Sequence, residues 1–205
     1  MLVRSPLRKR LRGADLAIAY AVVLVVVAVV IGVQPVAEGR RLVLESSTNL
    51  ENLRIAPLVV LFVSAFVTSS LTGLWIVAPV LWAYAVAQRW LGRGPTILVA
   101  AFGHVFATLA VAVLLASGIA HHQLDRDLAR EPDVGASYGL AAVVGVLTLR
   151  LPPRRRRWVV LAGTGVGLVA ALVSETFTDA GHLIAWGIGL AMGQVGLAIG
   201  RHTAA

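Results

Sequence analysis

The sequence predicts an all-α, polytopic membrane protein with six transmembrane helices and a long external first loop. Of its 205 residues, 58% are hydrophobic and only 14% are charged, against about 25% charged in an ordinary soluble domain. The mean hydropathy is +0.84. The apolar residues gather in runs near the ~20 residues that span a bilayer. The basic residues lie in the short segments between these runs, where they orient membrane helices.

Six segments have the length and apolar character of membrane spans. The first run is too long for the apolar core of a signal peptide and has no small-residue cleavage site before Gln34-Pro35, so we expect it to be retained. Pro95 is well placed to open the third helix. The six segments cover residues 15–33, 72–88, 95–118, 135–150, 157–174 and 180–200.

A seventh apolar segment, residues 57–68, is too short for a span and could be an interfacial or re-entrant helix. With six spans and a cytoplasmic N-terminus, thirteen of the eighteen basic residues lie inside, including the cluster Arg154 to Arg157. A seventh span would place that cluster outside, against the positive-inside rule. We therefore expect 57–68 to belong to an external first loop on or in the outer leaflet.

This charge pattern also decides domain organisation and location. We expect a basic cytoplasmic N-terminus at 1–14, a membrane domain at 15–200 and a short cytoplasmic tail at 201–205. We expect an integral protein of a bacterial plasma membrane, in contact with the lipid bilayer. The net charge of +8 is explained by orientation in the membrane, so no nucleic-acid partner is expected. The chain has no cysteine and therefore neither a disulfide nor a thiolate metal site.

Two short stretches carry groups that could perform chemistry inside the membrane. Ser137 lies 13 residues above Arg150, or ~20 Å along a helix, and His182 lies 14 residues above Gly196, or ~21 Å. The two side chains are therefore expected at similar depth, below the external surface. An ionisable group at such a depth is by default a candidate functional residue.

Small residues on both helices favour close packing between them. Ser137 shares a helical face with Ala141, Gly145 and Thr148, whereas His182 shares one with Ala185, Gly189, Gly193, Gly196 and Gly200. Small residues let membrane helices approach closely. We expect Gly145, Gly189 and Gly193 to form this contact and to bring Ser137 toward His182. The glycines taken alone are also typical of tight packing without any function.

A serine becomes a nucleophile when an adjacent base accepts its proton, and histidine can be that base near neutral pH. The start of the fourth helix offers free backbone N–H groups around Ser137 for a developing negative charge. The motif residues placed to support them are Gly135, Ala136, Tyr138 and Gly139. The competing interpretation is a serine that caps a helix and a histidine that is hydrogen-bonded in a polar pocket.

These stretches resemble the rhomboid superfamily of intramembrane serine proteases. GASYG at 135–139 is similar to the family's GxSG-type motif, and DAGHLIAWGIG at 179–189 is similar to its sixth-helix motif. RIAPLVVLFVSAF at 54–66 resembles the external loop before its second span. The resemblance implies a six-helix rhomboid-like bundle, Ser137 as nucleophile, His182 as general base, transmembrane proteins as substrates and no cofactor.

Three departures from the family's pattern, at four positions, favour an alternative. Tyr138 follows the serine where the family has glycine, and Gly73 and Val77 stand about where it has a histidine and an asparagine on the second helix. Ala141 replaces an aromatic residue that would stack on the histidine. The alternative is a catalytically inactive rhomboid-like protein, a pseudoprotease, that binds the transmembrane helices of client proteins.

Other polar residues are weaker candidates for a functional site. His104, on the third span, could hydrogen-bond near the site as an accessory residue or simply contact a neighbouring helix. His121 and His122, with Asp125 and Asp127 nearby, could suggest a metal site, but their spacing fits no compact ligand set and a solvated loop is favoured. No metal site is therefore expected.

Overall fold

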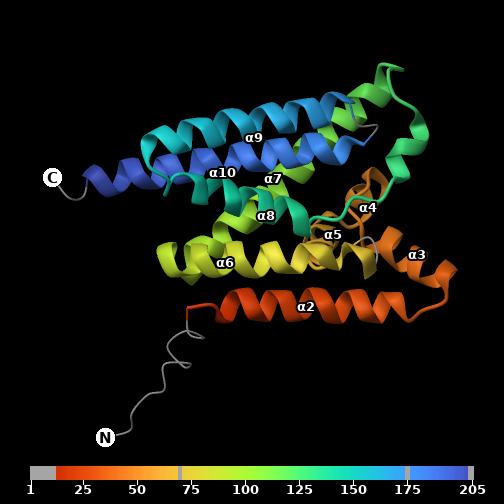
Figure 1. Cartoon of the computed structure of the whole chain (residues 1–205). Coiled ribbons are helices and arrows are strands. Elements are labelled where there is room, and N and C mark those ends of the chain that lie inside the picture. Colours follow the sequence, from red (N-terminus) through yellow and green to blue (C-terminus); the bar gives the residue numbers. More distant parts are fainter. Residues whose placement is uncertain (1–12, 69–70, 174–175, 203–205) are drawn as a thin grey trace, which may run out of the picture.

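The computed structural model describes residues 13–68, 71–173 and 176–202, and every regular element in this part of the chain is a helix (Figure 1). The expected all-α class is confirmed. Of the expected cytoplasmic ends, 1–14 and 201–205, residues 1–12 and 203–205 lie outside the described residues. In chain order, the helices are α2 (Asp15–Gly32), α3 (Val36–Ser46), α4 (Leu50–Ile55), α5 (Pro57–Ser64), η1 (Leu71–Ile76), α6 (Val77–Leu91), α7 (Arg93–Ala120), η2 (Arg126–Arg130), α8 (Ala136–Thr148), α9 (Pro153–Val173) and α10 (Phe177–His202).

Among the described residues, four helical stretches are long and apolar enough to cross a membrane. The apolar helix α8 has 13 residues and is ~20 Å long, shorter than the ~30 Å hydrocarbon core. The chain is therefore an integral membrane protein, whereas the total of six spans and the external position of the first loop stay predictions. The four stretches are Asp15–Gly32, Leu71–Leu91, Arg93–Ala120 and Pro153–Val173.

Glycine and proline divide the apolar sequence into these helices. Gly92 ends α6 with φ +90°, a left-handed conformation that residues with a Cβ rarely adopt. Proline opens α5 and α9, at Pro57 and Pro153, where the missing N–H would have had no partner. Pro95 lies in the first turn of α7, as predicted, although that helix begins two residues earlier.

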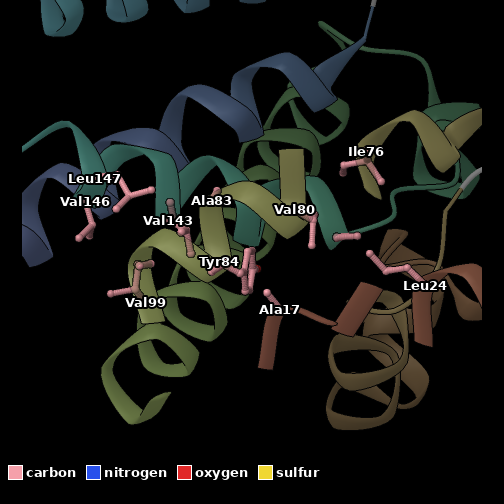
Figure 2. Close-up of a cluster of buried hydrophobic side chains, with 14 residues drawn as sticks. Ala17, Leu24, Ile76, Val80, Ala83, Tyr84, Val99, Val143, Val146 and Leu147 are labelled. Atoms are coloured by element: carbon pink, nitrogen blue, oxygen red, sulfur yellow. The ribbon is translucent and has the colours of Figure 1, made fainter. Parts of the chain in front are cut away.

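The short helix α8 occupies the centre of the molecule. It packs against α6, α7 and α10, and its contact with α10 is the most extensive between any two described elements. Tyr138, Ala142, Val143 and Val146 on α8 are almost completely buried. The hydrophobic core extends from α8 through α6 to α2, and the buried side chains of α6 in this core include Val80 (Figure 2).

Glycines bring these helices together at van der Waals distance. A Cβ added to Gly189 of α10 would lie 2.0 Å from the carbonyl oxygen of Ala142 in α8, and one added to Gly145 would lie 2.6 Å from the carbonyl of Trp186. A Cβ on Gly193 would lie 2.5 Å from the side chain of Leu149. The expected packing through Gly145, Gly189 and Gly193 is therefore present, and it lets two membrane helices meet backbone to backbone.

The segment between α2 and η1 forms three short helices, α3, α4 and α5. At eight residues, α5 is ~12 Å long and cannot span a bilayer. Its side chains Leu58, Val59 and Phe62 are 61–81% exposed, as expected of a short apolar helix that faces lipid. It ends within the bundle, because the carbonyl of Ala65 accepts a 2.6 Å hydrogen bond from the Tyr20 hydroxyl of α2.

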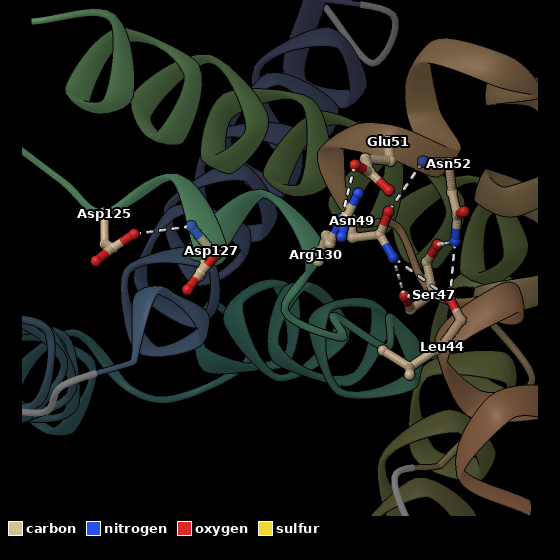
Figure 3. Close-up of polar contacts among 8 residues, drawn as sticks. All are labelled: Leu44, Ser47, Asn49, Glu51, Asn52, Asp125, Asp127 and Arg130. Atoms are coloured by element: carbon tan, nitrogen blue, oxygen red, sulfur yellow. Dashed lines mark hydrogen bonds and ion pairs between the residues drawn. The ribbon is translucent and has the colours of Figure 1, made fainter. Parts of the chain in front are cut away.

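A polar network holds the turn between α3 and α4 (Figure 3). The Asn49 side chain accepts from the Asn52 N–H at 2.9 Å and donates to the Ser47 hydroxyl at 2.9 Å, and the Asn52 amide donates to the carbonyls of Leu44 and Ser47. An exposed ion pair between Arg130 of η2 and Glu51 of α4, at 2.8 Å, joins this turn to the segment that precedes α8. The first loop is thereby tied to the chain that leads into the candidate site.

Candidate active site

Ser137 lies in the first turn of α8 and is half-buried. The turn is held by α5, because the N–H of Gly135, the N-cap residue, donates to the carbonyl of Ser64, the last residue of α5, at 3.0 Å. Gly135 has φ −91°, so a glycine is needed here for space and not for its backbone freedom. The turn that carries Ser137 is therefore fixed by the first loop.

The backbone of this turn leaves two donors free. The N–H groups of Tyr138 and Gly139 both donate to the carbonyl of Gly135, at 3.1 and 3.4 Å. Within the described chain, the N–H groups of Ala136 and Ser137 have no backbone acceptor, as expected at the start of a helix. Free N–H groups at a helix start favour a negative charge. Gly135, Tyr138 and Gly139 thus shape the turn, whereas Ala136 and Ser137 offer donors.

His182 lies on α10 against the same turn, and its nearest ring is that of Tyr138. The two ring centroids are 5.2 Å apart in an edge-to-face arrangement. No hydrogen bond joins Ser137 and His182 among the described residues. The face of α8 that meets α10 is led by Tyr138 and Ala142, one residue from the predicted face, and one residue is ~100° around a helix. The Ser137–His182 pair stays a prediction.

Tyr138 supplies the aromatic contact that the sequence led us to expect His182 to lack. Ala141 is indeed too small to stack on the histidine, but Tyr138 lies one turn earlier on the helix and its ring takes that place. The ring fits because Gly181 has no side chain: a Cβ there would lie 2.3 Å from the Tyr138 hydroxyl oxygen. The expected loss of a stacking surface on His182 is therefore wrong.

The hydroxyl of Tyr138 donates to both carboxyl oxygens of Asp133, at 3.0 and 3.2 Å. Thr48 of the first loop holds the same aspartate, with its N–H donating to the Asp133 carbonyl at 2.9 Å. Asp133 is only 2% exposed. Burial raises the pKa of this carboxyl to about 6, although its hydrogen bonds from Tyr138 and Thr48 act in the opposite direction. The hydrogen bonds among Thr48, Asp133 and Tyr138 thus connect the first loop to the aromatic ring that contacts His182.

Asp179 is the nearest acidic group to His182. Its Oδ1 lies 3.7 Å from the His182 Nδ1, one helical turn away, and both side chains are about one-third exposed. A carboxylate at this nitrogen would orient the ring and favour the proton on Nδ1, which leaves Nε2 as the basic atom. We did not expect this contact from the sequence, although the three-residue spacing from Asp179 to His182 is a signal that could have indicated it.

A serine–histidine contact between Ser64 and His104 lies beside the turn. The Ser64 hydroxyl and the His104 Nε2 are 3.2 Å apart, and the same Nε2 lies 2.8 Å from the carbonyl of Leu61. A carbonyl can only accept, so Nε2 carries the proton and donates to Leu61. His104 Nε2 is therefore not free to accept a proton from Ser64, and this pair is structural.

His104 also packs directly against the candidate turn. A Cβ added to Gly135 would lie 1.8 Å from the His104 Cε1. Both alternatives considered for His104 are therefore present, because the side chain bonds to α5 and lies beside the site. Its Nδ1 is buried without a hydrogen-bond partner in the described part of the chain. Sequence separations of about 30 to 43 residues hid these contacts with Leu61, Ser64 and Gly135.

The loop at 121–127, which was considered for a metal site, forms hydrogen bonds to residues close by in sequence. The Asp125 carboxylate accepts from the Asp127 N–H at 3.0 Å and caps η2, while the His121 Nδ1 lies 2.8 Å from the Ser117 carbonyl. Among the described residues, no group of three potential ligands is placed to hold a metal ion.

Comparison with known proteins places the chain in a family. Residues 10–204 match the model of the family described as rhomboid-like protein. No curated protein and no solved structure matches the chain. The family match extends over nearly the whole chain and includes the α8 turn and the α10 histidine, so the chain belongs to the rhomboid-like protein family.

Proposed function

We propose that this rhomboid-like membrane protein is an intramembrane serine protease in which Ser137 is the nucleophile and His182 the general base. The proposal is supported by the close contact between α8 and α10, through Gly145 and Gly189, since Ser137 and His182 both lie within the first two turns of these two helices. The substrates are transmembrane segments of other proteins, and no cofactor is required.

In the proposed reaction, the Ser137 hydroxyl attacks the carbonyl carbon of a substrate peptide bond while His182 accepts its proton. The N–H groups of Ala136 and Ser137 donate to the oxygen that becomes negatively charged. The imidazolium then gives its proton to the departing amine, and an acyl-serine ester remains. Water, activated by the same histidine, hydrolyses this ester and restores the serine.

The site must rearrange locally before this reaction. The ring of Tyr138 rests on His182, and Ser137 makes no hydrogen bond to that histidine in the described structure. Catalytic hydrogen bonds are often long or absent without substrate and form in the complex. The proposed reaction therefore requires Ser137 and His182 to come within hydrogen-bond distance when substrate binds.

The same contact supports a second candidate function. Tyr138 is fixed between Asp133 and His182 and fills space that a substrate would need. A protein whose α8 and α10 stay in this arrangement would bind client transmembrane helices without cutting them. Reactivity of Ser137 separates the two functions.

Labelling of purified protein with a serine-reactive fluorophosphonate tests the proposal. Because a base is needed to activate the hydroxyl, labelling should be lost in Ser137→Ala and fall at least about 100-fold in His182→Ala. Ser64→Ala is the matched control, since Ser64 also lies beside a histidine but one whose Nε2 is occupied. Absence of labelling in folded wild-type protein, or equal labelling of Ser137→Ala, would favour the non-catalytic function.

We also propose that the chain crosses the membrane six times with both ends cytoplasmic. The basic end of the bundle supports this topology: Arg93 pairs with Asp15 at the start of α2, and the Arg150 guanidinium lies 5.4 Å above the Trp90 ring. The ends of α6 and α8 and the starts of α2, α7 and α9 therefore lie together, with Arg154 to Arg157 beside them (Figure 1). Basic residues gathered at one end are typical of the cytoplasmic side.

A further inference from the structure

A cavity of about 640 Å³ lies between α2, α5 and α7, and its lining includes Gly135 and Gly139 of the α8 turn but not His182. Its walls are almost entirely apolar and include Tyr20, Phe62, Ala65 and Ala101. Its volume is within the range of ~300–1,000 Å³ that is usual for sites of small molecules and cofactors. No part of the proposed catalytic reaction uses this space.

The cavity is unsuited to water. Three wall residues, Tyr20, Tyr84 and His104, carry polar side-chain atoms. The Tyr20 hydroxyl donates to the carbonyl of Ala65 and the His104 Nε2 to that of Leu61, whereas the buried His104 Nδ1 has no partner in the described part of the chain. Ordered water inside a protein needs two to four polar partners, and apolar cavities without them stay dry. An empty space of this size would in turn lose the dispersion contacts of its lining.

The mouth of the cavity faces the region occupied by lipid. Leu58, Phe62 and Ile97 line it and are 49–81% exposed on the outer surface of the protein. The walls α2 and α7 are both candidate membrane spans. The medium around such helices is hydrocarbon, so the apolar group present at the highest concentration at this mouth is a lipid acyl chain.

We propose that this cavity binds one acyl chain of a bilayer lipid. The inner wall of the cavity includes His104, Gly135 and Gly139, so a bound chain touches the back of the turn that carries Ser137. The lipid therefore helps to hold this turn in position. Binding does not depend on whether Ser137 is a nucleophile, and it can be measured without any assay of proteolysis.

The test uses the whole protein in dodecyl maltoside micelles and a phosphatidylcholine with a diazirine in one acyl chain. After irradiation, crosslinked peptides are identified by mass spectrometry. We expect crosslinking of segments 58–66 and 97–105 to saturate with added photolipid and to fall when unlabelled phosphatidylcholine is added. Crosslinking that rises linearly, resists competition or is equally strong on the outer face of α9 would overturn the proposal.

Filling the cavity gives the decisive variant. The ring of Ala101→Phe would occupy the space of at least two methylene groups of a bound acyl chain. Each methylene group that is excluded weakens binding about fourfold. Half-saturation of the crosslinking should therefore need at least about tenfold more lipid. Val113→Phe is the matched control, because Val113 lies on the same helix, is 68% exposed and is outside the cavity. If Ala101→Phe fails to fold, Ala19→Phe fills the cavity from α2 instead. Unchanged saturation in a folded filling variant would refute the assignment.

Discussion

At the scale of single residues, Asp133 and Gly135 precede the α8 turn, and each contacts residues that are distant in sequence. The carboxyl of Asp133 contacts Thr48, and Gly135 contacts His104 and Ser64. Sequence motifs identify Gly135 as part of the turn but say nothing about these partners, because contacts between residues 30 to 85 positions apart leave no periodic signal. The depth and order of Ser137 and His182 could be predicted, whereas the surroundings of the turn could not.

The raised pKa of Asp133 predicts a specific dependence of stability on pH. Between pH 4 and pH 6 the folded protein keeps this proton while the unfolded chain loses it, so the free energy of unfolding should fall as the pH rises through this window and level off above it. A shift from 3.8 to about 6 corresponds to roughly 3 kcal/mol. Asp133→Asn should lose this component. Thermal unfolding in detergent from pH 4 to pH 7 measures it, and identical profiles for the two proteins would contradict the prediction.

Gly135 and His104 should be energetically coupled. Gly135→Ala pushes a methyl group into the His104 ring and should reduce stability by about 1–3 kcal/mol, the usual effect of overpacking. In the His104→Ala background the same methyl group meets no ring, so the double variant should lose less than the sum of the two single variants. A double-mutant cycle measured by denaturant unfolding tests this coupling, and strict additivity would show that the two residues do not meet.

At the scale of the elements, the apolar runs placed the long helices and α5 to within about four residues at each end, whereas α3, α4 and η2 were not predicted because their sequences are not apolar. The small-residue faces also identified α8 and α10 as packing partners. The rotation of α8 was predicted less well, since its face toward α10 is led by Tyr138. A stripe of small residues restricts which sides of two helices can meet, but Ala141 and Ala142 are equally small. The rotation of α8 that directs Ala142 toward α10 is the one that also buries the Tyr138 ring.

The close contact between α8 and α10 can be tested on two glycines of one helix. Gly189→Ala would place a Cβ 2.0 Å from the Ala142 carbonyl oxygen, whereas a Cβ on Gly187 would meet nothing within 4 Å. We expect Gly189→Ala to lower stability by about 1–3 kcal/mol. Gly187→Ala should be neutral or slightly stabilising, because alanine is the better helix former. Equal unfolding temperatures for the two variants would contradict the packing described here.

At the scale of the whole molecule, the positions of the basic residues and the lengths of the apolar helices together indicate the membrane topology. In the described part of the chain, Arg93, Arg150 and the cluster Arg154 to Arg157 lie at one end of the bundle, and the ion pair between Arg130 and Glu51 lies with the first loop and η2 at the other. The short helix α5 could be recognised as too short to span. Its contacts with α2, α7 and the α8 turn could not be predicted, because they depend on how the first loop folds back into the bundle.

Cysteine accessibility measures the proposed topology, since the chain has no cysteine of its own. Arg126→Cys and Arg155→Cys are both at exposed positions. In intact cells a membrane-impermeant maleimide should label Arg126→Cys at once and Arg155→Cys only after permeabilisation. The reverse pattern would place the Arg154 to Arg157 cluster outside and overturn the six-span arrangement.

The central claim is that the α8 turn presents a reactive serine. Its most direct test is the mass-spectrometric location of the fluorophosphonate adduct on the folded, wild-type protein. We predict a single adduct on the peptide that contains Ser137, formed faster as His182 loses its proton. An adduct on Ser64, or no adduct on a protein shown to be folded by its thermal unfolding, would contradict the claim.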